Sequence, residues 1–173
     1  MKKIIFLTML ISFTISQGLF SQTDKDIDVG FDLLISTDTA QQIREIEKFK
    51  ENIKNNINNF QKIEKYKDSL SFRNVYFKDK VLQLVKVQQI DNKVEKNVEW
   101  YFLDEQMIYA EVIWINIETK QNINHEKCYL NRWQMIAWVN NENKFIDLKS
   151  TEFKLRESEL VAYGKKMYND ENR

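Results

Sequence analysis

A short motif occurs three times in the chain: Tyr76-Phe-Lys-Asp-Lys-Val-Leu82, Tyr101-Phe-Leu-Asp-Glu-Gln-Met-Ile108 and Tyr129-Leu-Asn-Arg-Trp-Gln-Met-Ile136. In each copy, aromatic and aliphatic residues that favour strands flank a short polar segment that favours a turn. A short turn joins strands that run antiparallel. The repeat therefore predicts an antiparallel β-meander, and it carries no chemistry of its own.

The residues around the motif extend this prediction to six strands. They are 72–78, 81–90, 94–103, 107–117, 125–131 and 134–139. None of the three repeat turns contains glycine, the residue that most easily reaches positive φ. The sequence therefore predicts the hairpins but leaves the type of turn open.

The repeat also assigns the two faces of the sheet, because side chains two residues apart on a strand point the same way. One face is predicted to be buried, since it carries only apolar residues: Val75, Phe77, Trp100, Phe102, Cys128 and Leu130. The other face alternates tyrosine with polar residues and is predicted to be largely solvated: Asn74, Tyr76, Glu99, Tyr101, Lys127 and Tyr129. The strand 107–117 is apolar on both sides, so we expect something to cover part of its second face.

Two helices are predicted to flank the strands. Asp38 is a good N-cap, and apolar residues then recur at three- and four-residue spacing from Ile43 to Ile63. This predicts a long helix to about residue 66, with a bend or break near 55–59, that packs on the protein's own sheet. A second helix is predicted from 151 or 152 to 169, with Gly164 allowing close approach. The predicted fold is α+β: a long N-terminal helix, an antiparallel meander of about six strands, and a C-terminal helix packed on the sheet.

Residues 1–22 have the pattern of a secretory signal peptide. Lys2 and Lys3 precede an apolar run over 4–15, and small residues lead to predicted cleavage after Ser21 or Gln22. Residues 23–37 are interpreted as an acidic linker or a short strand, and 38–173 as a single α+β domain. An EF-hand-like spacing of aspartates begins at Asp24, but it lacks the glycine and glutamate that such a loop requires. The mature chain is expected in the periplasm or outside the cell, with no membrane span.

Composition narrows the classes of function. Basic and acidic residues are equal in number, 26 each, so no excess positive charge points to nucleic acid. His125 and Cys128 are the only residues of their types, and two ligands are too few for a zinc site. Their odd spacing places them on opposite faces of a strand, and Cys128 falls on the buried face, where a thiol is inert. The sequence predicts no catalytic residue, no metal site and no cofactor.

The aromatic residues are the best candidates for a binding site. Trp133 lies in a predicted turn, and Tyr76, Tyr101 and Tyr129 recur on the face predicted to be polar. Exposed aromatic rings could stack on a sugar or hold a partner's side chain. In the competing interpretation, which we favour, the tyrosines cover their own sheet and Trp133 folds back onto a neighbouring strand. Aromatic cross-strand pairs commonly stabilise sheets in this way.

Taken together, the order of elements resembles a group of small exported bacterial proteins of uncharacterised function. In that group an N-terminal helix precedes antiparallel hairpins with Tyr-Tyr-Phe-x-Asn-Gly-x-Leu-Ile repeats, and a C-terminal helix follows. The resemblance covers roughly 39–169 and depends on Trp100-Tyr-Phe102, on Cys128-Tyr-Leu-Asn131 and on Met135-Ile-Ala-Trp-Val139. The chain departs from the group in lacking the turn glycine. The group implies no activity and no catalytic residues.

These observations favour an exported, non-enzymatic binding or interaction protein that uses the open face of its sheet. The partner would be an unidentified protein or glycan. One alternative is a structural component of the cell envelope, which would self-associate. A hydrolase is a further alternative, and it would require a pocket in which carboxylates or His125 converge.

Overall fold

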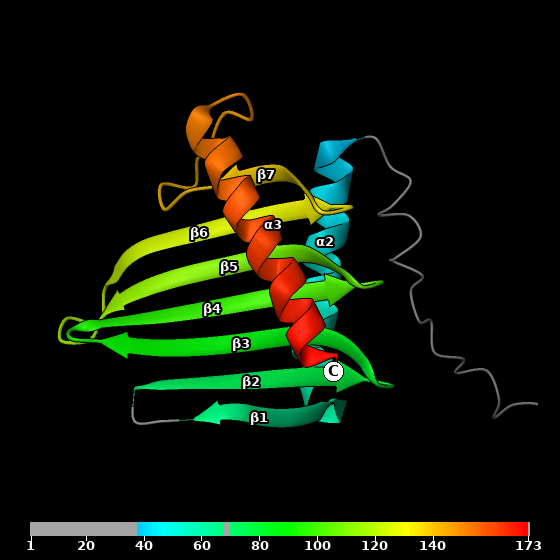
Figure 1. The fold of residues 1–173 in the computed structure, drawn as a ribbon. Helices are drawn as coiled ribbons and strands as arrows, with labels where there is room; N and C mark the ends of the chain where they lie inside the picture. The colour runs from blue at the N-terminus through cyan, green and yellow to red at the C-terminus, as the bar shows by residue number, and fades with distance from the viewer. Residues whose placement is uncertain (1–37, 68–69, 173) are drawn as a thin grey trace, which may run out of the picture.

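The computed structural model describes residues 38–67 and 70–172. The predicted signal peptide and the segment 23–37 lie outside these residues. The described elements are α2 (Thr39–Asn56), a 3-10 turn η1 (Ile57–Asn59), β1 (Gln61–Lys67), β2 (Ser71–Lys78), β3 (Val81–Asp91), β4 (Val94–Leu103), β5 (Gln106–Asn116), β6 (Asn122–Asn131), β7 (Gln134–Val139) and α3 (Thr151–Glu171). Figure 1 shows α3 crossing one face of the sheet diagonally, with α2 behind the opposite face.

The sheet is an antiparallel meander, as predicted, but it has seven strands rather than six. Its strands lie in the order of the sequence, from β1 to β7. The additional strand is β1, which pairs with β2 over residues that were assigned to the end of the first helix. The predicted strands from 72 to 139 all form, with ends that differ by a few residues.

The first helix is shorter than predicted, because it ends at Asn56 instead of continuing to residue 66. The Asn56 side chain donates hydrogen bonds to the backbone oxygen and the side-chain oxygen of Asn52, at 2.9 and 2.7 Å. Asparagine side chains compete with backbone hydrogen bonds in this way, and they disfavour helix interiors. The predicted break near 55–59 is therefore present. Ile63, which continued the helical spacing, lies on β1 and packs against the core beneath α3.

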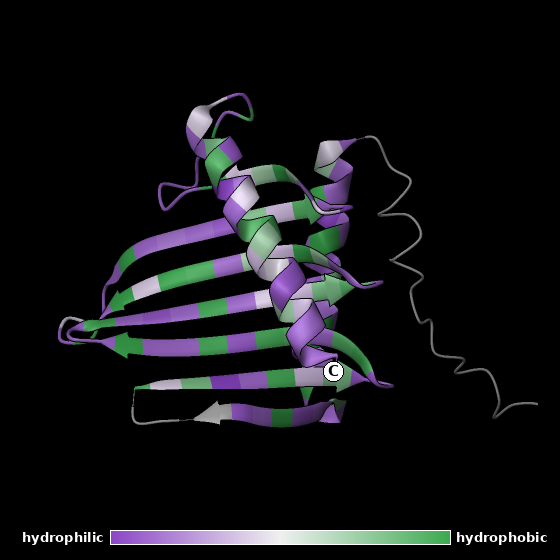
Figure 2. Ribbon diagram, viewed as in Figure 1, coloured by the Kyte–Doolittle hydropathy of each residue, from purple (hydrophilic) through white to green (hydrophobic). Residues whose placement is uncertain are grey.

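The two helices create two separate hydrophobic cores, one on each face of the sheet. On the face that we call the α3 face, Phe153, Leu160 and Met167 pack on alternate residues of β2 to β7. On the opposite α2 face, Ile46, Phe49 and Ile53 pack on a second set of strand residues. The expectation that the first helix packs on the protein's own sheet is confirmed. Figure 2 shows the apolar and polar bands that alternate along the strands.

The three repeat turns share one backbone conformation. Asp79 and Lys80 have φ values of 51° and 70°, and the pairs Asp104–Glu105 and Arg132–Trp133 are likewise positive. Two successive residues with positive φ are the pattern of a type I′ turn, whose twist matches that of the flanking strands. The chain forms this turn without glycine at any of the six positions, so backbone strain is held at each hairpin.

Each repeat also carries a β-bulge at the same place, two cross-strand pairs away from the turn. Tyr101 pairs with Tyr109, while Phe102 pairs with Met107, which leaves Ile108 as an extra residue. The same step occurs between Tyr76 and Phe77 and between Tyr129 and Leu130. A bulge places two successive residues on one face. Strict alternation along the strand 107–117 would place Ile108 on the same face as Ala110, but Ile108 and Tyr109 both lie on the α2 face and Ala110 lies on the α3 face.

Gly164 allows α3 to lie close to the sheet, as its place in the sequence suggested. A Cβ at this position would be 2.8 Å from Met107 Cε and 3.0 Å from Trp133 Cζ3. Such distances are closer than normal van der Waals contact. The missing side chain thus allows the helix to contact both β5 and the last repeat turn.

The strained turns lead to a stability prediction. We expect Lys80→Gly to have a free energy of unfolding about 1 kcal/mol higher than Lys80→Ala. Both variants remove the same exposed side chain, but only glycine adopts φ near 70° without a clash at Cβ. Urea denaturation of the two variants measures this difference. Equal stability, or a more stable alanine variant, would contradict the positive φ at this turn.

Candidate functional site

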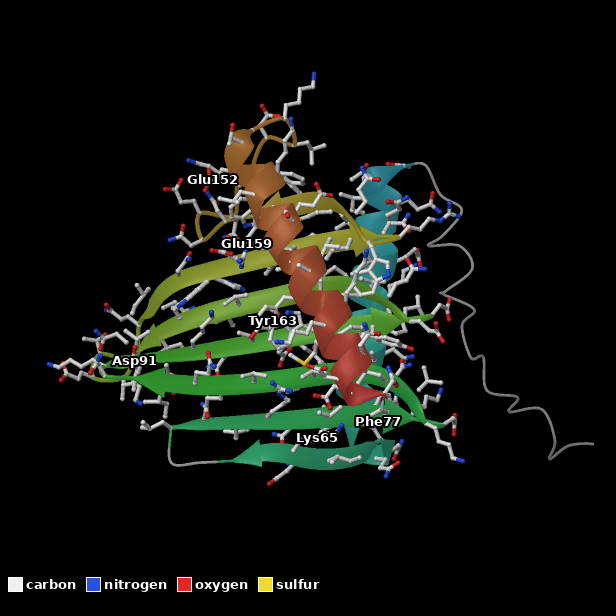
Figure 3. The ribbon with its side chains drawn as sticks, viewed as in Figure 1. Lys65, Phe77, Asp91, Glu152, Glu159 and Tyr163 are labelled. Carbon is white, nitrogen blue, oxygen red and sulfur yellow. The ribbon has the colours of Figure 1, made fainter. Side chains whose placement is uncertain are left out.

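A cleft of about 340 Å³ lies between the sheet and α3, and we call it the α3 cleft. Its volume is within the range of small-molecule sites, which is roughly 300–1,000 Å³. The lining residues come from β2 to β5 and from one side of α3: Arg73, Val87, Gln89, Lys96, Val98, Trp100, Val112, Arg156, Glu159, Leu160, Tyr163 and Met167. Figure 3 shows Glu159 and Tyr163 on the side of α3 next to the strands that the helix leaves uncovered.

The floor of the α3 cleft is a row of valines. Val87 pairs with Val98, and Val98 pairs with Val112, so the three side chains stand next to one another across β3, β4 and β5. Val98 and Val112 are buried and Val87 is half-buried. β-branched residues pack well on a pleated surface, which is why this row forms a flat and rigid floor.

One wall of the α3 cleft is aromatic. The ring of Tyr163 on α3 stacks on Trp100 of β4, with centroids 5.8 Å apart and an interplanar angle of 23°. Trp100 is buried, but Tyr163 is 56% exposed. An exposed ring at the edge of an apolar concavity is a surface on which a ligand can gain contact area.

The rim of the α3 cleft is charged. Arg73 donates to Glu171 Oε1 at 2.9 Å, and Arg156 donates to Glu126 Oε2 at 2.7 Å. These two ion pairs tie α3 to β2 and β6. Lys96 lies differently, because its Nζ is 5.3 Å from the centroid of the Trp114 ring in a cation–π contact.

The structure places His125 and Cys128 on opposite faces, as the sequence predicted. His125 Nε2 is 2.7 Å from Glu111 Oε1 on the α2 face. Cys128 is fully buried on the α3 face, and burial raises the pKa of its thiol to about 12. A thiol with this pKa is not a nucleophile at neutral pH. The arrangement that would have favoured a hydrolase, with His125, Cys128 and a carboxylate together, is therefore not formed.

The three predicted tyrosines are buried rather than solvated. Tyr76 is 9%, Tyr101 0% and Tyr129 5% exposed, because α2 lies over this end of the sheet. The prediction of a largely solvated face is wrong here. The sequence pattern predicted a helix that packs on the sheet, but it did not show which face of the sheet this helix covers.

These tyrosines form a row with Tyr109 beneath α2. The Tyr109 ring makes edge contacts with Tyr101 and Tyr129, with centroids 5.6 and 5.2 Å away. The Tyr101 hydroxyl donates to Glu99 and the Tyr129 hydroxyl donates to Glu47, each at 2.7 Å. Burial, reinforced by nearby carboxylates, raises the pKa of the Tyr101, Tyr109 and Tyr129 hydroxyls far above the ordinary value. The row therefore stabilises the packing of α2, and a binding role for it stays a prediction.

A charged row follows the tyrosines on the same face. Lys86, Glu99, Glu111 and Lys127 are successive cross-strand neighbours on β3 to β6. Glu99 Oε1 is 2.7 Å from Lys86 Nζ. Burial would raise the pKa of the Glu99 carboxyl, but hydrogen bonds from Lys86 and Tyr101 outweigh it and hold the pKa below its ordinary value.

Trp133 lies in the last repeat turn and folds back onto α3 rather than onto a strand. Its ring packs on the α3 core close to Gly164, and Lys165 Nζ is 5.6 Å from its centroid. The residue is half-buried and borders a shallow groove with Lys154, Glu157 and Lys165. The structure thus separates Trp133 from the three tyrosines, which lie on the other face, so the four do not form one site.

Two further searches cover only the residues that the structure describes. No group of three or more His, Cys, Asp or Glu side chains within 38–67 and 70–172 is arranged to hold a metal ion. Among the same residues, no helix is both long and apolar enough to span a membrane.

Comparison of the chain with protein families, curated proteins and solved structures gives no match. The resemblance to small exported proteins with hairpin repeats therefore stays a prediction.

The sequence analysis missed the α3 cleft, although part of its signal was present. Val98 lies two residues before Trp100, on the face that was predicted to be buried, and strand pairing places Val87 and Val112 beside it. The next residues on that face are polar: Gln89 on β3 and Lys96 on β4. This change from apolar to polar residues along β3 and β4 marks the limit of the surface that α3 covers. The cleft lies at this limit.

The pKa of Glu99 leads to a pH prediction. Because its folded pKa is depressed, the carboxylate stabilises the fold above its unfolded pKa of about 4.3, and this contribution is lost as pH falls through the folded pKa. We expect Glu99→Gln to lower the free energy of unfolding by roughly 1–3 kcal/mol at pH 7. The difference from the wild type should shrink as pH falls below the unfolded pKa and the carboxylate of Glu99 takes up a proton.

Urea denaturation at several pH values measures this difference. Glu142→Gln is the control, because Glu142 forms an exposed pair with Lys144 and should change stability little at any pH. A difference between wild type and Glu99→Gln that is the same at pH 7 and pH 3 would contradict the assignment.

Proposed function

We propose that this chain is an exported, non-enzymatic binding protein and that the α3 cleft is its ligand site. The observation that carries the proposal is the exposed Tyr163 ring stacked on Trp100 at the edge of a valine floor. The strand residues that pack directly against α3 are buried, whereas this concavity is partly open and combines an apolar floor with a charged rim. A small molecule with a flat apolar body fits the surface better than a large polar partner does.

The packing of the cleft supports a preformed site. Its floor belongs to three hydrogen-bonded strands in the middle of the sheet, and its wall belongs to a helix that Leu160 and Met167 anchor in the core. The ion pairs Arg73–Glu171 and Arg156–Glu126 fix the helix laterally. A ligand would therefore bind without ordering a loop, which reduces the entropy lost on association.

The side chains around the α3 cleft favour binding over hydrolysis. Arg73 and Arg156 are held by carboxylates, and His125 with its partner Glu111 lies on the other face of the sheet. Nucleophilic catalysis requires a nucleophile and a base within hydrogen-bond reach of each other. The described residues bordering the cleft include no such pair, whereas its apolar floor and aromatic wall are the usual components of a binding pocket.

A neutral aromatic probe tests the proposal. We expect 2-naphthylmethanol to shift the amide NMR signals of Val98, Val112 and Leu160 and the indole signal of Trp100. Tyr163→Ala should weaken binding about three- to tenfold, because an aromatic stack contributes roughly 0.5–1.5 kcal/mol. Titration calorimetry or the NMR titration itself gives the affinities.

The matched control is Phe145→Ala. Phe145 is 67% exposed, compared with 56% for Tyr163, but it does not border the α3 cleft. This variant should bind the probe like the wild type. Absence of shifts in the cleft, or equal loss of affinity in both variants, would overturn the proposal.

Export is the second part of the proposal, and it is supported by Lys2, Lys3 and the apolar run over 4–15. When the full chain is produced in a bacterial host, we expect mature protein that begins at Gln22 or Thr23. Intact mass measurement of the periplasmic and extracellular fractions tests this. Recovery of the chain with residues 1–22 still attached, and only inside the cell, would contradict it.

A further inference from the structure

The charges around the α3 cleft are unbalanced. Three cations border it, Arg73, Lys96 and Arg156, and they face a single bordering carboxylate, that of Glu159. A cation that already pairs with a carboxylate of the protein attracts a ligand anion only weakly.

The two arginines are neutralised within the fold. Arg73 pairs with Glu171, whose side chain is 1% exposed and also binds Lys65 at 2.7 Å. Arg156 binds Glu126 at 2.7 Å and lies 3.7 Å from Glu159. In these pairs the carboxylates neutralise the charges of the two arginines. The arginines therefore attach α3 to the sheet and attract a ligand anion only weakly.

Lys96 has no such partner. Among the residues that the structure describes, no carboxylate oxygen lies within 4.0 Å of its Nζ. Its strand neighbours Glu95 and Asn97 alternate to the opposite face, where both bind each other's side chain. On its own face its cross-strand neighbours are Gln89 and Trp114, both uncharged. Lys96 is half-buried and its cross-strand neighbours are uncharged, and at such a site an ion pair is stronger than in open water.

The position of Lys96 also sets a length for the ligand. Lys96 and Trp100 are four residues apart on β4 and on the same face, so their Cα atoms are about 13 Å apart. Val98 lies between them on the floor. A ligand that stacks on Tyr163 would need an elongated apolar body to bring a charged end to Lys96 and the Gln89 amide.

We propose that the ligand of the α3 cleft is an amphipathic monoanion: a flat or elongated apolar body on the valine floor, with one carboxylate at Lys96. This inference rests on the proposed function, since it assumes that the cleft binds a ligand. A single unpaired ammonium matches a single negative charge. The Gln89 side chain can donate a further hydrogen bond to the carboxylate.

Three matched probes test which ligand charge the cleft prefers: 2-naphthoate, 2-naphthylmethanol and 2-naphthylmethylammonium. They share one ring system and carry a negative, a neutral and a positive group. With the mature protein at low salt, we expect 2-naphthoate to bind at least about fivefold more tightly than the alcohol, and the ammonium compound to bind most weakly. Lys96→Gln should remove the advantage of the carboxylate, so that it lowers the affinity for 2-naphthoate at least about fivefold more than it lowers the affinity for the alcohol.

Lys93→Gln is the control, because Lys93 is an exposed lysine of the same hairpin that pairs with Glu118 away from the cleft. It should keep the preference for 2-naphthoate. If the alcohol binds in the cleft as tightly as 2-naphthoate, or if Lys96→Gln keeps the preference for 2-naphthoate, the proposal of an anionic ligand is overturned. The proposal that the cleft is a binding site would still hold. If none of the three probes binds in the cleft, the proposed function itself fails.

Discussion

The repeated hairpin, with its positive-φ turn and adjacent bulge, is the constraint on which the rest of the structure depends. The turn fixes which residues pair, and the bulge inserts one extra residue into the second strand of each hairpin. Both effects occur at the same end of three hairpins, so the sheet acquires regular rows of side chains across its strands. A one-residue slip would move the tyrosines and the valines to opposite faces, and both cores would be lost.

These rows make the two faces chemically different. Beneath α2, four tyrosines lie next to lysines and glutamates, and the hydroxyls of Tyr101 and Tyr129 donate to a strand carboxylate and a helix carboxylate. Beneath α3, the rows are aliphatic and aromatic, and the helix approaches closely through Gly164. Because α3 crosses the strands diagonally (Figure 1), the cleft opens along the edge of the helix, above Val87, Val98 and Val112. The α3 cleft is thus a consequence of the crossing direction of the helix and of the residues that lie beyond its edge.

The sequence predicted those features that depend on local patterns. Alternation and turn residues located the strands from 72 to 139, and the odd spacing of His125 and Cys128 correctly placed them on opposite faces. Features that depend on tertiary packing were not predicted. The stripe that ends at Ile63 has helical spacing, yet pairing with β2 converts its last part into β1. The tyrosines looked exposed because their neighbours are polar, and only the position of α2 shows that they are buried. The cleft combines β4 with α3, which are about 60 residues apart, so no local pattern could define it.

The proposed ligand site therefore depends on the valine floor of the cleft beside α3. The most direct measurement uses mature protein with ¹³C-labelled valine methyl groups and bound 2-naphthoate. Intermolecular nuclear Overhauser effects then report which methyl groups lie within about 5 Å of the naphthalene ring, a range slightly longer than that of a packing contact. The account predicts effects from the ring to Val98 and Val112, and none to Val139 on the opposite face. Effects that involve only valines outside the cleft, or none from the floor while the probe is bound, would contradict it.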